Sequence, residues 1–109
     1  MQNSNSFNRK IYGLLKKVPK GKVTTYKILA EAAGTKAYRV VGQAMRCNPY
    51  APTVPCHRVI KSDASIGGFQ GNLNQKSKEV RKKIRMLRKE GINIKNNKVV
   101  DFEEVLYEF

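Results

Sequence analysis

The chain has 109 residues with 40% hydrophobic content, enough for one folded domain with a modest core and too much for a disordered basic tail. Its 22 Lys and Arg against 8 Asp and Glu give a formal net charge of +14, a balance typical of proteins that face a polyanion. A basic surface that serves solubility or heat resistance is the competing explanation. No apolar run approaches the ~20 residues of a membrane-spanning helix, and the polar N-terminal segment does not resemble a secretory signal.

The first predicted element is an amphipathic helix over residues 6–17, which Pro19 and Gly21 bring to an end. Its apolar positions recur at helical spacing: Phe7, Ile11, Leu14, Leu15 and Val18. A second helix follows, capped by Thr24 or Thr25 and closed by Gly34. Its predicted inner face consists of Tyr26, Leu29, Ala30 and Ala33.

After a short turn at residues 35–37, a third helix is predicted to run to Asn48 and Pro49, which stop it. The residues expected on its inner face are Tyr38, Val41, Ala44 and Met45. Two short helices joined by a tight Gly-containing turn fit a helix-turn-helix. Many small helical domains contain such a pair, so pattern and charge alone leave DNA reading as one of two interpretations.

Residues 50–72 are predicted to form a shaped loop with a short strand over 58–61. The loop residues expected to be buried are Val54, Val59, Ile60 and Phe69.

A fourth helix is predicted from Leu73 to Gly91. Its apolar stripe consists of Leu73, Val80, Ile84 and Leu87. Its solvated basic face consists of Lys78, Arg81, Lys82, Arg85 and Lys89. Residues 92–100 alternate about Asn96 and Asn97 and predict a small hairpin, and the tail 101–109 is expected to dock on the body.

These elements predict a mainly α fold with a small β element, of winged-helix-like or helix-turn-helix type, in a single domain over residues 1–109. Two cysteines without an export signal indicate reduced thiols and a cytoplasmic protein. Cys47, Cys56 and His57 are too few for a zinc site, which needs about four ligands. Neither a metal nor a cofactor is therefore expected.

The stretch VPCHRVI, residues 54–60, places a thiol beside the single histidine of the chain. A thiol needs a nearby base or cation to act as a nucleophile, and here His57 is a candidate base while Arg58 adds positive potential. Adjacent side chains in an extended segment point to opposite faces, so His57 is expected to reach Cys56 only through a turn or a bridging water. A buried structural cysteine beside a satisfied histidine is the alternative.

The wider segment NPYAPTVPCHRVI resembles the active-site segment of the O6-alkylguanine-DNA alkyltransferases, with Pro-Cys-His-Arg-Val at residues 55–59. VPKGKVTTY resembles the lead into that family's helix-turn-helix, YRVVGQAMRCNP its recognition helix, GGFQG its substrate loop and KEGI the end of its late helix. The resemblance extends over residues 7–94 and corresponds to the C-terminal, catalytic and DNA-binding domain. Most members carry an additional N-terminal domain, sometimes with structural zinc, which we expect to be absent here.

The resemblance implies that the protein flips an O6-alkylated guanine out of duplex DNA and transfers the alkyl group to Cys56. Nothing in the chain could cleave the thioether product, so each molecule is expected to react once and without a cofactor. The implied partner is double-stranded DNA containing O6-alkylguanine, bound by a monomer that has no membrane partner. Whether several molecules pack along one duplex stays open.

The resemblance also implies roles for individual residues around the cysteine. His57 draws the proton from Cys56 through water, and Glu90 orients the imidazole, which is the logic of nucleophile, base and orienter. Asn48 holds the turn that carries the cysteine.

Further roles concern the DNA. Arg39 corresponds to the family's arginine finger, which takes the place of the extruded base, and Tyr26 to the tyrosine that crowds the target phosphate and is proposed to give a proton to the departing guanine. The implied DNA-binding residues are Thr25, Tyr26, Arg39, Gly42, Gln43, Ala44, Arg46 and Arg58. The implied substrate pocket consists of Tyr26, Val54, Pro55, Val59, Gly68, Phe69, Gln70 and Gly71.

Two residues depart from the family pattern, and three rival functions fit parts of the sequence. Phe69 stands where the family often has tyrosine, which removes one hydroxyl contact. Cys47 stands where a small residue is usual, and it is either a bystander thiol or an alternate acceptor.

The alkyltransferase-like proteins, which bind lesions and flag them for other repair machinery, have another residue at the position of Cys56. A plain helix-turn-helix regulator leaves PCHRV unexplained, and no oxyanion device supports a cysteine hydrolase.

Overall fold

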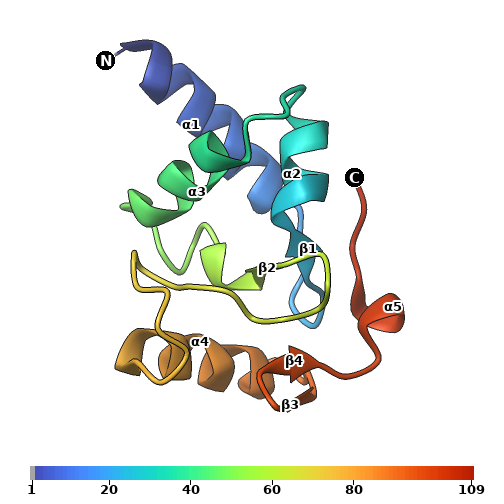
Figure 1. Cartoon of the computed structure of the whole chain (residues 1–109). Coiled ribbons are helices and arrows are strands. Elements are labelled where there is room, and N and C mark those ends of the chain that lie inside the picture. The colour runs from blue at the N-terminus through green and yellow to red at the C-terminus, as the bar shows by residue number, and fades with distance from the viewer. Residues whose placement is uncertain (1) are drawn as a thin grey trace.

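The computed structural model describes residues 2–109 as an upper group of three helices, a central pair of short strands and a lower layer formed by a fourth helix and a hairpin (Figure 1). In chain order the elements of this part of the chain are α1 (Gln2–Leu15), β1 (Thr24–Thr25), α2 (Tyr26–Ala32), α3 (Tyr38–Arg46), the 3-10 turn η1 (Cys56–Arg58), β2 (Val59–Ile60), α4 (Lys78–Lys89), β3 (Ile94–Lys95), β4 (Lys98–Val99) and α5 (Phe102–Val105). The mainly helical class with a small β element is the one predicted.

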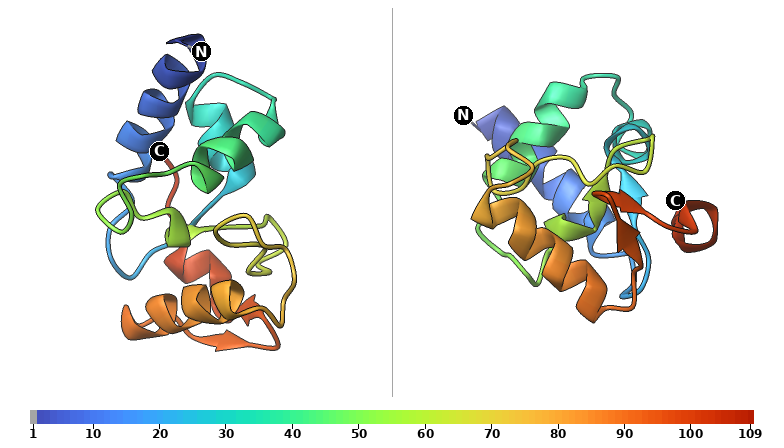
Figure 2. Two further views of the ribbon diagram at one scale, coloured as in Figure 1. Left: turned by 90° about the vertical axis from the view of Figure 1, so that its left-hand side faces the viewer. Right: turned by 60° about the horizontal axis from the view of Figure 1, so that its bottom comes forward.

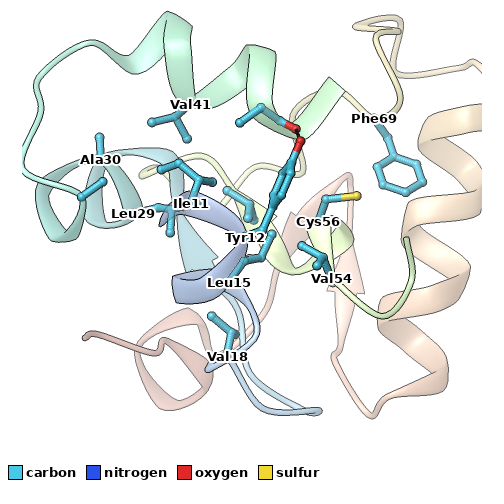
Figure 3. Close-up of a cluster of buried hydrophobic side chains, with 13 residues drawn as sticks. Ile11, Tyr12, Leu15, Val18, Leu29, Ala30, Val41, Val54, Cys56 and Phe69 are labelled. Atoms are coloured by element: carbon cyan, nitrogen blue, oxygen red, sulfur yellow. Dashed lines mark hydrogen bonds between the residues drawn. The ribbon is translucent and has the colours of Figure 1, made fainter. Parts of the chain in front are cut away.

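Helices α1, α2 and α3 pack around the first of two apolar cores. Thr25 begins α2 by accepting a hydrogen bond from the Ile28 N–H at 3.0 Å, and Gly34 follows its end in the left-handed conformation, with φ of 81°. The Tyr12 hydroxyl donates to the Ala44 carbonyl at 2.9 Å and ties α1 to α3 (Figure 3). The fully buried members of this core include Ile11, Leu15, Val18, Leu29, Val41 and Val54.

A short parallel ladder connects the start of α2 to the turn η1. Strand β1 pairs with β2, with Thr24 opposite Val59 and Thr25 opposite Ile60. Because β1 runs directly into α2 and β2 follows η1 directly, the ladder holds the first helix of the helix-turn-helix against the segment that carries the predicted nucleophile. All four strand residues are buried, so the ladder is shielded from competing water.

Helix α4 is capped by Ser77, whose hydroxyl accepts a hydrogen bond from the Val80 N–H at 3.2 Å. The prediction that Leu73 belongs to its apolar stripe is wrong, because Leu73 is 80% exposed and lies before the helix. The side chains of Asn72 and Asn74 each accept the backbone N–H two residues further on, and such turns keep this segment out of the helix. Confirmed positions are the buried Val80, Ile84 and Leu87 and the exposed Lys78, Arg81, Lys82, Arg85 and Lys89.

The predicted hairpin is confirmed as β3 paired antiparallel with β4, with Ile94 opposite Val99. Asn96 and Asn97 both have positive φ, 50° and 57°, as a two-residue turn of this type requires. The hairpin and α4 enclose the second core, whose fully buried members include Val23, Ile60, Ile66, Val80, Leu87 and Ile92.

The C-terminal tail docks on the body, as predicted, beside Val23. The Val23 N–H donates to the Val105 carbonyl at 2.9 Å, and the Tyr107 N–H donates to the Val23 carbonyl at 2.7 Å. These bonds place the residues after α5 next to the segment that leads into β1 (Figure 2).

Some predicted boundaries differ from the structure. Helix α1 ends at Leu15 rather than at residue 17, and Tyr38 is 47% exposed rather than on the inner face of α3, because it occupies the first position of that helix. The predicted strand over 58–61 shortens to two residues, since Arg58 belongs to η1. No helix within residues 2–109 combines the length and the apolar character needed to cross a bilayer.

Candidate active site

The turn η1 places Cys56 on the wall of a cavity of about 740 Å³. The thiol is 7% exposed, and its sulfur is directed toward the side on which Phe69 lies (Figure 3). The cavity lies between α3 and the loop that precedes α4. The predicted site residues on its wall are Tyr26, Arg39, Gly42, Gln43, Arg46, Cys56, Gly68, Phe69, Gln70 and Gly71.

Nine predicted site residues do not line this cavity: Thr25, Ala44, Asn48, Val54, Pro55, His57, Arg58, Val59 and Glu90. Thr25 is buried and its hydroxyl caps α2, and Ala44 is buried in the upper core, so neither side chain belongs to an exposed DNA-binding face. Val54, Pro55 and Val59 are buried and do not line the cavity. Their place in the substrate pocket stays a prediction, and their side chains pack into the protein around the Cys56 turn and do not form the cavity wall.

His57 and Glu90 form a buried pair. The His57 Nε2 lies 2.9 Å from Glu90 Oε2, and the two side chains are 3% and 12% exposed. Because a carboxylate only accepts hydrogen bonds, Nε2 carries the proton of the neutral imidazole and Nδ1 is left as the acceptor. Among residues 2–109 no direct hydrogen bond joins His57 to Cys56, although both belong to the same turn.

The Arg58 side chain points inward, toward Glu90, so the bonds that it makes in the free protein do not support its predicted role in DNA binding. Its Nε donates to Glu90 Oε1 at 2.9 Å, and its Nη2 donates to Glu90 Oε2 at 2.7 Å. Its Nη1 donates to the Val18 carbonyl at 2.9 Å. With these bonds the guanidinium is held inside the protein and is not presented to a DNA phosphate.

The surroundings of this pair set its charge. Burial lowers the pKa of His57 below its ordinary value, Glu90 opposes that effect, and the charges of Arg58 and Lys83 add to it. Burial acts to raise the pKa of Glu90, but hydrogen bonds from Arg58 and His57 outweigh it and bring that pKa below its ordinary value. At neutral pH the imidazole is therefore uncharged and the carboxylate ionised.

Asn48 organises the loop between α3 and η1. Its Nδ2 donates to the Val54 carbonyl at 2.9 Å, and its Oδ1 accepts the Tyr50 N–H at 2.9 Å. The amide thus spans the loop just before Cys56 and fixes the path of the backbone into η1.

Tyr26 forms part of the cavity wall at the start of α2. Burial, with a smaller contribution from the Cys56 charge, raises the pKa of Tyr26 to about 12. The phenol therefore stays protonated at neutral pH and remains a hydrogen-bond donor.

Lys83 belongs to the site and was missed by sequence reasoning. Its Nζ is fully buried and donates to the carbonyls of Val59 at 2.7 Å, Ile66 at 2.7 Å and Gly68 at 3.1 Å. The lysine thereby ties the strand after Cys56 to the loop that walls the cavity. The available signal was its position three residues after Val80, on the apolar stripe of α4.

The loop at residues 68–72 closes on itself in a tight turn. The N–H of Phe69 donates to the Asn72 carbonyl at 2.9 Å, and the N–H of Asn72 donates to the Phe69 carbonyl at 3.0 Å. Gln70 and Gly71 turn the chain with φ of 53° and 83°. A Cβ added at Gly68 would lie 2.8 Å from the Asn72 carbonyl oxygen, so the turn requires glycine there.

Sequence reasoning also missed several cavity residues, which carry no motif of their own: Tyr38, Met45, Lys61, Gly67, Asn72, Leu73 and Gln75. Cys47 is exposed at the end of α3 and does not line the cavity. Over the described residues 2–109, no group of three or more His, Cys, Asp or Glu side chains could hold a metal ion.

Known proteins match this arrangement in sequence. The profile of the 6-O-methylguanine DNA methyltransferase, DNA binding domain, matches residues 6–92. The methylated-DNA–protein-cysteine methyltransferase of Pyrobaculum aerophilum is 51% identical over 61 residues, which cover 56% of this chain and 40% of the relative. The enzyme of the same name from Sulfolobus acidocaldarius is 37% identical over 90 residues, which cover 83% of this chain and 52% of the relative.

Solved structures match the fold. The S. pombe protein Atl1, in complex with damaged DNA containing O6-carboxymethylguanine, superposes with a TM-score of 0.80 at 28% identity, covering 96% of this chain and 97% of Atl1. The O6-methylguanine-DNA methyltransferase of Pyrococcus kodakaraensis gives a TM-score of 0.67 at 40% identity, covering 79% of this chain and 46% of that one.

The first three curated relatives are longer than this chain, which spans 40%, 28% and 32% of their lengths. The match over residues 6–92 nevertheless includes the predicted helix-turn-helix, the Cys56 turn and Glu90. The chain therefore belongs to the 6-O-methylguanine DNA methyltransferase family and contains its DNA-binding domain.

Proposed function

We propose that this protein repairs DNA by removing an alkyl group from the O6 oxygen of guanine and keeping it on Cys56. The observation that carries the proposal is the Cys56 thiol on the wall of a cavity, in one turn with a His57 whose Nδ1 is left as an acceptor by Glu90. A structural cysteine would need neither an open cavity nor a base oriented by a carboxylate.

The reaction exchanges one hydrogen atom for one alkyl group. The Cys56 proton passes through water to His57 Nδ1, the sulfur attacks the alkyl carbon, and a C–S bond forms as the C–O6 bond breaks. The electron pair stays on guanine, which takes up a proton and leaves as the normal base. The chain offers no group that would cleave the thioether, so one molecule performs one transfer.

Access to the lesion requires DNA, because guanine O6 lies inside the base stack until the nucleotide is turned out. Arg39, Gln43 and Arg46 are exposed on one side of α3 and reach the cavity wall, with Gly42 between them. This arrangement supports α3 as the helix that meets the duplex, with Arg39 filling the gap left by the extruded base. A complex with DNA is known for the M. tuberculosis relative, which superposes with a TM-score of 0.69 at 31% identity.

The loop and the tyrosine complete the proposed pocket. Phe69 supplies an apolar wall near the sulfur, and the turn at Gln70 and Gly71 presents backbone groups at the cavity edge. Tyr26 holds its proton at neutral pH and is the proposed source of a hydrogen bond or proton for the departing guanine.

A second candidate function is lesion binding without transfer. The likeness to Atl1, which covers almost the whole of both chains, favours it. Cys56 favours transfer, since the alkyltransferase-like proteins replace this residue.

One experiment separates the two functions. The protein is mixed with an equimolar duplex that contains one O6-methylguanine, and its intact mass and tryptic peptides are measured. We expect the peptide of Cys56 to gain the mass of one methyl group less the thiol hydrogen that it replaces, with no second transfer when more duplex is supplied.

The variant Cys56→Ala should gain no mass while still binding the duplex, and the matched variant Cys47→Ser should react as the wild type does. A wild type that binds the lesion without gaining mass would leave lesion binding as the function. A methyl group on Cys47 instead would overturn the assignment of the nucleophile.

A further inference from the structure

The Glu90 carboxylate serves two donors that are neighbours in sequence. One oxygen, Oε2, is shared between His57 Nε2 at 2.9 Å and Arg58 Nη2 at 2.7 Å, while Oε1 accepts from Arg58 Nε at 2.9 Å. Arg58 thus binds the carboxylate with two parallel bonds, the strongest geometry available to this pair of groups. The orienter of the proposed base is therefore itself neutralised by a fixed cation.

Arg58 is held from the other side as well. Its Nη1 donates at 2.9 Å to the carbonyl of Val18, a fully buried residue just after α1. Glu90 lies at the C-terminal cap of α4, and Arg58 lies in η1. The guanidinium therefore bridges the end of α1 and the end of α4, and its position relative to His57 is fixed by three elements.

The charges that face His57 are those of Glu90, Arg58 and Lys83. An ionised Glu90 alone would pull a proton onto His57 and form a carboxylate–imidazolium pair. An imidazolium has no acceptor nitrogen and could not take the Cys56 proton. With Arg58 on the same carboxylate, the negative charge is already balanced before His57 binds to it.

We propose that Arg58 is a positioning residue that neutralises Glu90 and so keeps His57 in its uncharged, proton-accepting form. The role of Arg58 in catalysis rests on the proposed alkyl transfer. Its effect on the protonation of His57 does not depend on that proposal. Arg58 is thereby assigned to control of the base instead of DNA binding.

His57 is the only histidine of the chain, so the ring-proton signals of one imidazole can be followed by NMR as the pH is changed. In Arg58→Gln the pKa of His57 should rise by about 1 unit or more, since removal of the cation leaves Glu90 as the dominant charge. Arg88→Gln is the matched control, because Arg88 lies in the last turn of α4, two residues before Glu90, but donates to the Ile94 carbonyl. Its His57 should titrate as in the wild type.

If Arg58→Gln does not fold, Arg58→Met is compared with the wild type in its place, because it also removes the cation and leaves the Glu90 charge. The pKa of His57 should again rise. An equal pKa of His57 in the wild type and in the folded variant would overturn the inference.

The rate of methyl transfer to Cys56 gives the second readout. Its acid limb should move to higher pH in Arg58→Gln by the same interval as the His57 titration, and the rates should approach those of the wild type where His57 is neutral in both. A rate lowered equally at all pH values would mean that Arg58 only supports the structure. A wild type that transfers nothing would refute the proposed function and leave the NMR result standing.

Discussion

Among single side chains, Lys83 has the most unusual surroundings. It is fully buried, and three backbone carbonyls accept its hydrogen bonds, which matches the three N–H bonds of an ammonium group. Burial lowers its pKa to about 7, against 10.5 for an unperturbed lysine. Loss of the Lys83 proton would remove one N–H donor and leave one buried carbonyl without a hydrogen bond. Hydrogen bonding therefore opposes the lowering of the pKa by burial.

This balance predicts how stability depends on pH. Between pH 7 and pH 10.5 the unfolded chain holds the Lys83 proton more firmly than the folded one, so the free energy of unfolding gains up to about 1.4 kcal/mol per pH unit from this group. Lys83→Met removes this contribution, and its stability should fall further behind the wild type as the pH rises through this window.

Urea unfolding at several pH values measures the difference in the free energy of unfolding between the wild type and Lys83→Met. The control is Lys82→Met, one position earlier and exposed, whose curve should run parallel to that of the wild type. A gap between wild type and Lys83→Met that does not change with pH would mean that the three carbonyls keep Lys83 protonated throughout.

Among the elements, α3 contains a glycine that the packing of the free protein does not explain. A Cβ added at Gly42 would meet nothing within 4 Å, and the residue lies on the cavity wall between exposed side chains. A glycine inside a helix costs about 1 kcal/mol relative to alanine. Close approach of a DNA groove to the backbone of α3 would account for it.

Gly42→Ala should therefore raise the free energy of unfolding by about 0.5–1 kcal/mol and weaken binding to duplex DNA. Gly13→Ala on α1 is the matched control, since an added Cβ there also meets nothing within 4 Å. It should give a similar gain in stability with unchanged DNA binding, measured by fluorescence anisotropy. An unaltered DNA affinity in Gly42→Ala would show that α3 does not approach the duplex closely.

Local sequence patterns predicted the elements wherever nearby residues determine them. The cap at Thr25, the left-handed Gly34 and the Asn96–Asn97 turn depend on contacts within a few residues, and all three are confirmed. The start of α4 was predicted too early, because apolar spacing at Leu73 gave no weight to the turns made by neighbouring asparagines.

The candidate site was less accessible to sequence reasoning. The motif pointed to Cys56 and His57, and family resemblance added Glu90, but the inward turn of Arg58 depends on a partner 32 positions away. Lys83 likewise bonds to Val59 across 24 positions, a distance over which spacing along the chain carries no information.

At the scale of the whole molecule, the charge of +14 predicts binding that weakens steeply with salt. Each phosphate contact releases condensed counterions, so the logarithm of the binding constant should fall linearly with the logarithm of salt concentration. Arg46→Gln, at an exposed position on the proposed DNA-binding side of α3, should reduce the slope by about 1.

Lys95→Gln serves as the control, because Lys95 is exposed on β3, and that hairpin lies beside the end of α4, away from α3 (Figure 1). Its slope should equal that of the wild type. A salt response that is flat for all three proteins would show that the net charge does not serve nucleic-acid binding and would leave solubility as its explanation.

The bonds between Val23 and the tail have a practical consequence for anyone who truncates or labels this protein. Leu106 forms an isolated parallel bridge with Val23, and the Val105 carbonyl and the Tyr107 N–H bond the N–H and the carbonyl of Val23. Cutting the chain before Val105 would bare that edge to strands from other molecules, a known route to self-association. Purification tags and fluorophores are therefore better attached at the N-terminus, since the first turns of α1 lie far from this junction (Figure 1).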